Sequence, residues 1–255
     1  MDGVEDDRVS TRGFGDGSTY ERGRPGYPDE ALALFARSFG LEAGKRVIDL
    51  GAGTGKFTRQ LASFGVEILA VEPSPSMRAE LERTVPGVDL ADGSAEAIPA
   101  DDASVDAVFV AQAFHWFDPD RALTEIARVL RPGGGLGLIW NERDESVEWV
   151  HRLSQAIEWP ERRPYPADRD YRAVVSAHPD FVDVSRHRFP FHQTLDHAGL
   201  MDRLASTSYI TAMSAAERTA FLAPLAERVS ELPETVDLPY VTSVYTARRF
   251  TDSRA

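Results

Sequence analysis

The segment Val47-Ile48-Asp49-Leu50-Gly51-Ala52-Gly53-Thr54-Gly55-Lys56 decides the fold of this chain. A short apolar run ends beside a carboxylate, three glycines follow at alternate positions, and helix-forming residues come next at 57–62. This order is typical of a buried parallel strand, a tight turn and a helix that opens over a ligand. Glycine is needed where the backbone takes an unusual conformation or where a ligand leaves no room for a Cβ. The segment therefore predicts a ligand-binding loop.

Strand and helix patterns alternate regularly around this loop. The predicted strands are Arg46–Leu50, Glu67–Val71, Val88–Ala91, Val105–Ala111 and Gly135–Trp140, and the predicted helices between them are Thr54–Ser63, Pro75–Thr84 and Pro119–Leu130. Such alternation with short connections predicts a parallel sheet with helices on both faces. In these sheets the ligand binds outside the carboxyl ends of the strands. The residues just after each strand are therefore the candidates for the site.

Beyond residue 145 the pattern changes to a mixture of helices and two longer strands. Strands are predicted at Asp183–Thr194 and Tyr240–Arg249, helices at Val147–Glu158, Ala198–Leu204 and Ala215–Val229, and a proline-rich loop at Trp159–Pro166. Two late strands joined through extra helices predict an antiparallel sheet edge that carries a lid. The predicted fold class is α/β: a Rossmann-like, doubly wound, mostly parallel seven-stranded sheet with an antiparallel edge and a helical lid.

The pattern divides the chain into five parts. Residues 1–18 have no apolar periodicity and are expected to form a mobile tail. Residues 19–44 are predicted to form an N-terminal cap segment, in which Asp29 caps a helix that runs to Phe39. Residues 45–145 form the ligand-binding core, residues 146–239 form the lid or substrate-specificity region with the sixth strand, and residues 240–255 form the last strand and tail.

The composition limits the class of function. A net charge of −13 argues against nucleic acid as the main partner, because phosphate binding needs a basic face. The chain has no cysteine, which excludes disulfides and thiolate metal sites, and no metal site is expected. Neither a signal peptide nor a membrane-spanning run is visible, so we expect a cytoplasmic enzyme that acts as a monomer or homodimer without a membrane partner.

Two common glycine-loop motifs are excluded by position. In a P-loop, the pair Gly55-Lys56 needs a glycine at position 50 and a hydroxyl residue at position 57, where this chain has Leu50 and Phe57. A dinucleotide fingerprint needs its third glycine at position 56, which is Lys56. The loop therefore holds a ligand of another kind.

Carboxylates near the predicted strand ends suggest that this ligand contains an adenosine. Glu72 ends the second strand, where a carboxylate can accept both hydroxyls of a ribose that lacks a 2′-phosphate. Asp49, just before the turn, is expected either to orient an ammonium group or to hold the amides of the turn. The turn Asp92-Gly93-Ser94-Ala95-Glu96 follows the third strand and is placed to meet the adenine.

The chain resembles the class I S-adenosylmethionine-dependent methyltransferases over roughly residues 45 to 140. Four motifs in the right order carry the resemblance: Val47–Gly55, Ala70-Val71-Glu72-Pro73-Ser74, Gly93-Ser94-Ala95-Glu96 and Leu130-Arg131-Pro132-Gly133-Gly134. A narrower likeness lies in Tyr20–Pro28, Ala113-Phe114-His115-Trp116-Phe117 and Trp140-Asn141-Glu142-Arg143-Asp144. These segments are similar to the small-molecule branch that includes the trans-aconitate methyltransferase-like proteins.

The resemblance implies S-adenosylmethionine as cofactor, S-adenosylhomocysteine as product, and a set of binding residues. The glycine turn would contact the cofactor's amino-acid end, Glu72 its ribose, and Ser94 and Ala95 its adenine. Arg24 would pair with its carboxylate. The implied cofactor-binding residues are Tyr20, Arg24, Asp49, Gly51, Ala52, Gly53, Glu72, Pro73, Ser94, Ala95, Gln112, Ala113 and Phe114, and the implied substrate-binding residues are Tyr27, His115, Trp116, Trp140, Asn141 and Arg143.

Methyl transfer from a sulfonium needs alignment and desolvation more than it needs chemical groups on the protein. We expect an apolar pocket at the strand ends, with walls from Phe114, Trp116, Phe117 and Trp140. His115 is the candidate catalytic residue, either as a general base or as a group that orients the acceptor, because a neutral imidazole accepts a proton near pH 7. Otherwise His115 only holds the cofactor loop.

The acceptor follows less directly from the residues. The trans-aconitate resemblance implies O-methylation of a carboxylate, with Arg143 or a lid residue such as Arg203 as the cation in the pocket. A phenolic, nitrogen or carbon nucleophile in secondary metabolism is the alternative acceptor, and His115 would then matter more. Two further hypotheses are a non-catalytic S-adenosylmethionine-binding protein and an NAD-dependent oxidoreductase.

Overall fold

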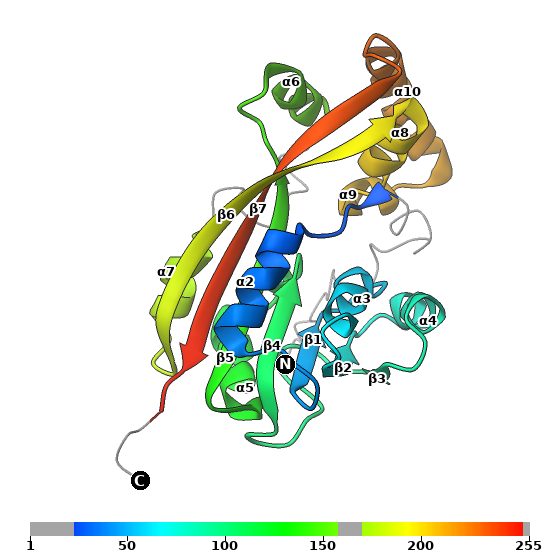
Figure 1. Ribbon diagram of the computed structural model, residues 1–255. Helices are drawn as coiled ribbons and strands as arrows, with labels where there is room; N and C mark the ends of the chain where they lie inside the picture. Colours follow the sequence, from blue (N-terminus) through cyan, green and yellow to red (C-terminus); the bar gives the residue numbers. More distant parts are fainter. Residues whose placement is uncertain (1–22, 158–169, 252–255) are drawn as a thin grey trace, which may run out of the picture.

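Seven strands form one sheet in the order β3-β2-β1-β4-β5-β7-β6 (Figure 1). The computed structural model describes residues 23–157 and 170–251. The predicted tail at 1–18, Tyr20 and the proline-rich segment 159–166 lie outside these ranges. The strands are β1 (Arg46–Leu50), β2 (Glu67–Val71), β3 (Asp89–Ala91), β4 (Val105–Ala111), β5 (Leu130–Arg143), β6 (Phe181–Asp196) and β7 (Thr235–Arg249).

The first five strands run parallel, and β7 pairs antiparallel with both β5 and β6. The bounds predicted for β1, β2 and β4 are confirmed, and β3 is one residue shorter than predicted. Apolar runs bounded by turn residues define these strands well, because both faces of a parallel strand are covered. The predicted fold class, a mostly parallel sheet with an antiparallel edge, is confirmed.

Strands β5 and β7, which pair antiparallel with each other, are longer than predicted. β5 continues past Trp140 to Arg143, so Asn141 and Arg143 lie within the strand rather than after it. β7 begins at Thr235, five residues before the predicted start, and the predicted boundary between 239 and 240 therefore falls inside this strand. The strand accommodates Pro239 because pairing with β5 ends at Tyr240, so the missing N–H of Pro239 leaves no gap in that ladder.

Helices cover both faces of the parallel half. The helices are α2 (Asp29–Phe39), α3 (Lys56–Ala62), α4 (Pro75–Thr84), η2 (Phe114–Trp116), α5 (Pro119–Val129), α6 (Glu148–Ile157), α7 (Tyr171–Ser176), α8 (His197–Ala205), α9 (Ser208–Thr211) and α10 (Ala215–Ser230). One apolar cluster joins α2 and α3 to one face of the sheet, and a second joins α5 and α7 to the other. Asp29 does not cap α2 as predicted: Pro28 occupies the cap position, and Asp29 is an acid of the first turn.

The lid stands on a long two-stranded ribbon. Figure 1 shows β6 and β7 as a long twisted pair at the edge of the sheet, with α8 and α10 gathered at its upper end. A third apolar cluster holds this region together and is built from α6, α8, α10 and the first half of β7. The lid therefore has a small core of its own. None of the helices in the described ranges is long and apolar enough to cross a membrane.

Candidate active site

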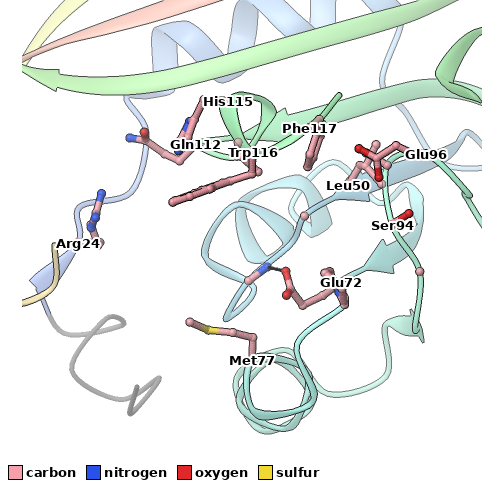
Figure 2. A pocket seen from close by; sticks show the side chains of 17 residues that line it. Arg24, Leu50, Glu72, Met77, Ser94, Glu96, Gln112, His115, Trp116 and Phe117 are labelled. Carbon is pink, nitrogen blue, oxygen red and sulfur yellow. Dashed lines mark hydrogen bonds between the residues drawn. The ribbon is translucent and has the colours of Figure 1, made fainter. Parts of the chain in front are cut away.

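Two adjoining cavities open at the carboxyl ends of the parallel strands. Figure 2 shows the larger one, between the ends of β1, β2 and β4, with Glu72 and Met77 on one side and His115 and Trp116 on the other. The larger cavity is lined by Arg24, Leu50, Gly51, Gly53, Glu72, Pro73, Met77, Gly93, Ser94, Ala95, Glu96, Ala111, Gln112, Ala113, His115, Trp116 and Phe117. The smaller cavity is lined by Arg24, Pro25, Tyr27, Gly51, Ala52, Gly53, Thr54, Lys56, Phe57, Ala111, Gln112, Asn141 and Arg203.

The glycine turn forms the floor shared by both cavities. Gly51 and Gly53 have φ values of 72° and 57°, a conformation that favours glycine. The amides of Gly51 and Ala52 donate to the carbonyl oxygen of Val71, which ties the turn to the end of β2. A Cβ on Gly53 would have no atom within 4 Å, so the space above it is open to a ligand. The turn therefore offers a close approach to backbone, as its sequence predicts.

Glu72 lies across the turn with both carboxylate oxygens engaged. Oε2 accepts from the amide of Gly53 at 2.9 Å, and Oε1 accepts from the amide of Ser74 at 2.9 Å. Each carboxylate oxygen has a second lone pair for a ligand hydroxyl. Burial raises the pKa of Glu72, and the two amide bonds oppose this. A pair of adjacent hydroxyls is the ligand group that this carboxylate suits.

Asp49 lies beneath the turn rather than in the cavity wall. Its side chain is fully buried, and Oδ2 accepts from the hydroxyl of Thr58 at 2.6 Å. Within the described chain, Oδ1 has no hydrogen-bond partner. Burial raises the pKa of Asp49 to about 7, the Thr58 hydroxyl opposes this, and the nearby Glu72 adds to it. The turn is therefore supported from below by a carboxyl group that holds its proton unusually well.

The far end of the larger cavity is a mostly apolar slot. Ser94 and Ala95 follow β3 and lie opposite Met77 of α4. Glu96 also lines the slot, and its Oε1 accepts from the amide of Asp118. Met77 was not among the predicted residues, because a buried methionine in an amphipathic helix looks like a core residue in the sequence. The slot suits a flat heterocycle.

The segment after β4 forms the opposite wall. Gln112 has a φ of 57°, and its side chain donates to the carbonyl oxygen of Asn141 on β5. This conformation turns His115 and Trp116 to the cavity, while Phe114 points into the core and is 1% exposed. Phe114 therefore lies behind the wall, in edge contact with Tyr171, rather than in the wall as expected.

Trp140 also lies behind the wall. It is 6% exposed and lines neither cavity, because Tyr171 stacks on it with ring centroids 4.2 Å apart. Its indole nitrogen lies 3.5 Å from Nδ1 of His115 and donates to it. Trp140 thus reaches the site through His115, and its ring is not a wall.

Residues 23–28, which we call the strap, cross the smaller cavity. Gln60 of α3 holds the strap by two bonds to the backbone of Tyr27, one to its amide at 2.9 Å and one to its carbonyl oxygen at 2.8 Å. Asn141 donates to the carbonyl oxygen of Gly26, and Arg24 donates to the carbonyl oxygen of Ser206 after α8. The strap therefore joins the sheet to the lid and brings Arg24 to both cavities.

Three arginines gather where the strap meets the lid. Arg24 and Arg203 line the smaller cavity, and Arg143 is close enough to both for their positive charges to repel one another. Arg203 donates through Nε to the hydroxyl of Tyr240, and Arg143 donates to the hydroxyl of Ser154. Burial lowers the pKa of both, that of Arg203 to about 10. Among the described residues, no carboxylate lies within ion-pair distance of Arg143 or Arg203.

Most residues singled out in the sequence meet at these two cavities, and some do not. Asp49, Phe114, Trp140 and Arg143 line neither cavity, and Tyr20 lies outside the described residues.

Several lining residues were not predicted as binding residues: Met77, Gly93 and Lys56. Arg203 was expected only as one example of a lid cation. It is far from the other site residues in the chain. In the sequence, only its position relative to the apolar residues of its predicted helix could have indicated that its side chain points inward. Within the described ranges, three or more metal-ligating side chains do not gather anywhere in a way that could hold a metal ion.

The arrangement suits a nucleoside that carries a charged amino-acid tail. The apolar slot would take the base, the Glu72 carboxylate two adjacent hydroxyls, and the glycine turn with its arginines a carboxylate.

Comparisons with known proteins show which family the chain belongs to. Residues 48–138 match the family model described as “Methyltransferase domain”. Over 229 residues the chain is 43% identical to an uncharacterised methyltransferase of Mycobacterium tuberculosis, which covers 88% of this chain and 89% of the relative. It is 34% identical over 241 residues to an uncharacterised methyltransferase-like protein of Schizosaccharomyces pombe, covering 94% of each. A solved candidate type II methyltransferase of Anaeromyxobacter dehalogenans has a TM-score of 0.60 at 26% identity, over 89% of this chain and 97% of that one.

Proposed function

This chain belongs to the class I S-adenosylmethionine-dependent methyltransferases, and we propose that it methylates a carboxylate oxygen of a small organic acid. The enzyme class and the cofactor follow from the family. The acceptor is our inference, and the arginine cluster is the observation that carries it.

We propose the following seat for the donor. Ser94, Ala95, Pro73 and Met77 enclose the adenine, and Glu72 binds the ribose. The amino-acid end enters the smaller cavity, over the amides of the glycine turn and beside Arg24. The sulfonium then lies where both cavities meet, close to Gln112 and Ala113. Space above Gly53 and the orientation of the Glu72 carboxylate support this arrangement.

The charge at the strap and lid supports an acidic acceptor. The donor's amino-acid end carries one carboxylate together with its own ammonium group. One carboxylate beside Arg24 leaves the positive charge of Arg143 and Arg203 in a mostly buried setting. Among the described residues neither arginine has a carboxylate partner, and a buried cation without a counterion is costly, so the site favours a second anion. A carboxylate matches the planar guanidinium in shape and charge.

Two relatives that match only part of this chain have names that specify different acceptors. Malonyl-[acyl-carrier protein] O-methyltransferase of Methylococcus capsulatus is 47% identical over 97 residues, 36% of this chain and 35% of that protein. Demethylmenaquinone methyltransferase of Beutenbergia cavernae is 39% identical over 100 residues, 39% of this chain and 42% of that protein. Their names specify different acceptors, although both match this chain over a similar length. The segment that these chains share therefore reflects the common methyl donor and does not identify the acceptor. The motifs that resemble the trans-aconitate branch point to an acid.

The donor would supply the methyl group carried on its sulfur. S-adenosylhomocysteine would then leave as a neutral molecule. The protein's part is to align and desolvate the attacking oxygen. Arg203 would fix the acid's charge, Trp116 and Phe117 would exclude water, and the Gln112 segment would set the approach. Well-oriented reactants gain roughly 7–11 kcal/mol from positioning alone. Carboxylates are ionised at neutral pH, so no proton has to be removed.

A labelled-methyl transfer screen tests this proposal. The full chain is incubated with methyl-labelled donor and panels of small acids, phenols, amines and carbon acids. We expect acids to be labelled, and we expect alkali to release that label as methanol, because esters hydrolyse and ethers do not. Label that survives alkali, on a phenol or an amine, would overturn the carboxylate assignment. The apolar walls Trp116 and Phe117 make a phenolic acceptor the second candidate.

A variant pair links that result to the arginines. Arg203→Met should weaken binding of the unmethylated acid that the screen identifies to the S-adenosylhomocysteine complex by about 10- to 100-fold, and should weaken binding of its neutral amide much less. Arg172→Met, at an exposed position on α7, is the matched control and should change neither. Equal losses for acid and amide would show that Arg203 is structural.

A further inference from the structure

His115 and Trp140 form a pair in which the direction of the hydrogen bond is fixed by chemistry. An indole N–H donates and cannot accept, so the 3.5 Å contact requires an unprotonated Nδ1 on His115. A neutral imidazole carries one proton, and that proton must then be on Nε2. We propose that Trp140 holds His115 in this form, so that His115 donates a hydrogen bond to the acceptor rather than removing a proton from it.

The surroundings of Trp140 make its indole an effective positioning group. Tyr171 stacks on one side with an angle of 4° between the rings, and Tyr245 meets it edge-on at 5.8 Å. The ring is 6% exposed, so water does not compete for its N–H. Its strand, β5, is held by β4 and β7 on either side. The indole N–H therefore keeps its direction toward His115.

The same bond argues against a general base. To take a proton at Nε2 as a base, the imidazole must begin with its proton on Nδ1. That proton would face the indole N–H across the 3.5 Å contact, and the hydrogen bond would be lost. A base is also unnecessary for an acid. The carboxylate oxygen forms its bond to the methyl carbon as the sulfur–carbon bond breaks, the electron pair stays on sulfur, and no proton moves.

This inference rests on the proposed function for the identity of the acceptor, and its first test does not. Long-range nitrogen NMR of the full chain with S-adenosylhomocysteine bound reports which imidazole nitrogen of His115 is protonated. We expect the Nε2–H form to predominate, and Trp140→Phe to move the equilibrium toward the Nδ1–H form. Tyr171→Phe keeps the stacked ring and the indole N–H, so it should leave the equilibrium unchanged. A predominant Nδ1–H form in the wild-type chain, or no change in Trp140→Phe, would overturn the proposal.

Kinetics with a pair of His115 variants gives a second test that does not depend on the folding of Trp140→Phe. A glutamine side chain donates from nitrogen and is a negligible base. His115→Ala should lower kcat/KM for the acceptor by about 10- to 100-fold, and His115→Gln should recover most of that loss. Equal losses in the two variants would overturn the donor role of His115.

The two proposals fail differently. If no acid is methylated but His115 is found in the Nε2–H form, the acceptor assignment is wrong and the pairing with Trp140 stands. If acids are methylated and the Nδ1–H form is found, the acceptor stands and the donor role of His115 is lost.

Discussion

Glu72 is the residue on which the seat of the donor most depends. Its carboxylate already accepts two backbone amides at the turn, and its remaining lone pairs are the ones we assign to the ribose. Glu72→Gln keeps the size and removes the charge. It should weaken S-adenosylhomocysteine binding by about 1.5–3 kcal/mol, about 10- to 150-fold in Kd, because bonds to charged groups are lost. Calorimetry measures this, and Glu82→Gln on the exposed side of α4 is the control. Unchanged affinity in Glu72→Gln would contradict the ribose assignment.

Asp49 gives a prediction about stability and pH. Burial raises its pKa from 3.8 to about 7 in the folded chain, so the folded state binds the proton more tightly than the unfolded state. Its contribution to stability is therefore complete below pH 3.8 and is lost as the pH rises through 7. Between about pH 5 and about pH 8, wild type should lose about 2–3 kcal/mol of unfolding free energy relative to Asp49→Asn.

Urea unfolding at a series of pH values measures this difference. Asp89→Asn changes an exposed carboxylate at the start of β3 and should show no such trend relative to wild type. A difference between wild type and Asp49→Asn that is constant across the range would mean that Asp49 titrates normally.

At the scale of elements, the strap couples the sheet, the lid and both cavities. Gln60 lines neither cavity and holds the strap by two bonds to Tyr27. Gln60→Ala should weaken S-adenosylhomocysteine binding by about 1–2 kcal/mol, about 5- to 30-fold in Kd, because ordering the strap then costs part of the binding energy. Ser63→Ala, at the exposed end of α3, is the matched control. Equal affinity in Gln60→Ala and wild type would show that the strap is fixed by its remaining contacts.

Elements differ in how well the sequence predicted them. The bounds of β1, β2 and β4 follow from apolar runs whose limits are set by local chemistry, and the bounds of α4 follow from Ser74 at its cap and Pro75 in its first turn. The bounds of β5 and β7 depend on each other, because Arg143 at the end of β5 pairs with Tyr240 of β7. Pro239 lies just beyond this last pair. The short helix α7 has only two buried side chains, Tyr171 and Val175, which is too few for a helical period to be seen.

The site shows the same division. Gly51, Glu72 and Gln112 directly follow strands, and Ser94 lies in the turn after β3. The topology of a parallel sheet therefore brings them together, and their positions in the chain were enough to predict it. Phe114 and Trp140 were expected in the wall, and whether an aromatic ring faces a cavity or the core depends on local turns. The φ of 57° at Gln112 directs Phe114 to the core, and no residue pattern predicts this backbone conformation.

At the scale of the whole molecule, we expect the lid to be a separate unit of stability. Its apolar cluster, in α6, α8, α10 and the start of β7, is distinct from the two clusters on the sheet. Small units with few buried contacts open more readily than central strands. Amides of α8 and α10 should therefore exchange with deuterated water faster than those of β1 and β4. Mass spectrometry measures this for each peptide, and equal protection in lid and sheet would mean that they open together.

The binding of both ligands should change this exchange selectively. If Arg203 binds the acid's carboxylate, S-adenosylhomocysteine should protect the glycine turn and the strap, and the unmethylated acid should add protection at α8, which carries Arg203. The acid's neutral amide is the control. Added protection that is equal for acid and amide would separate lid closure from the charge of the acceptor.

The structure of the S-adenosylhomocysteine complex tests the central claim most directly. We predict adenine between Ser94, Ala95 and Met77, both ribose hydroxyls about 2.5–3.0 Å from the carboxylate oxygens of Glu72, and the amino-acid end over the glycine turn beside Arg24. The sulfur would then lie where the two cavities meet, open to His115 and Trp116. A nucleoside bound elsewhere, or bound here with Glu72 turned away from the ribose, would contradict this claim.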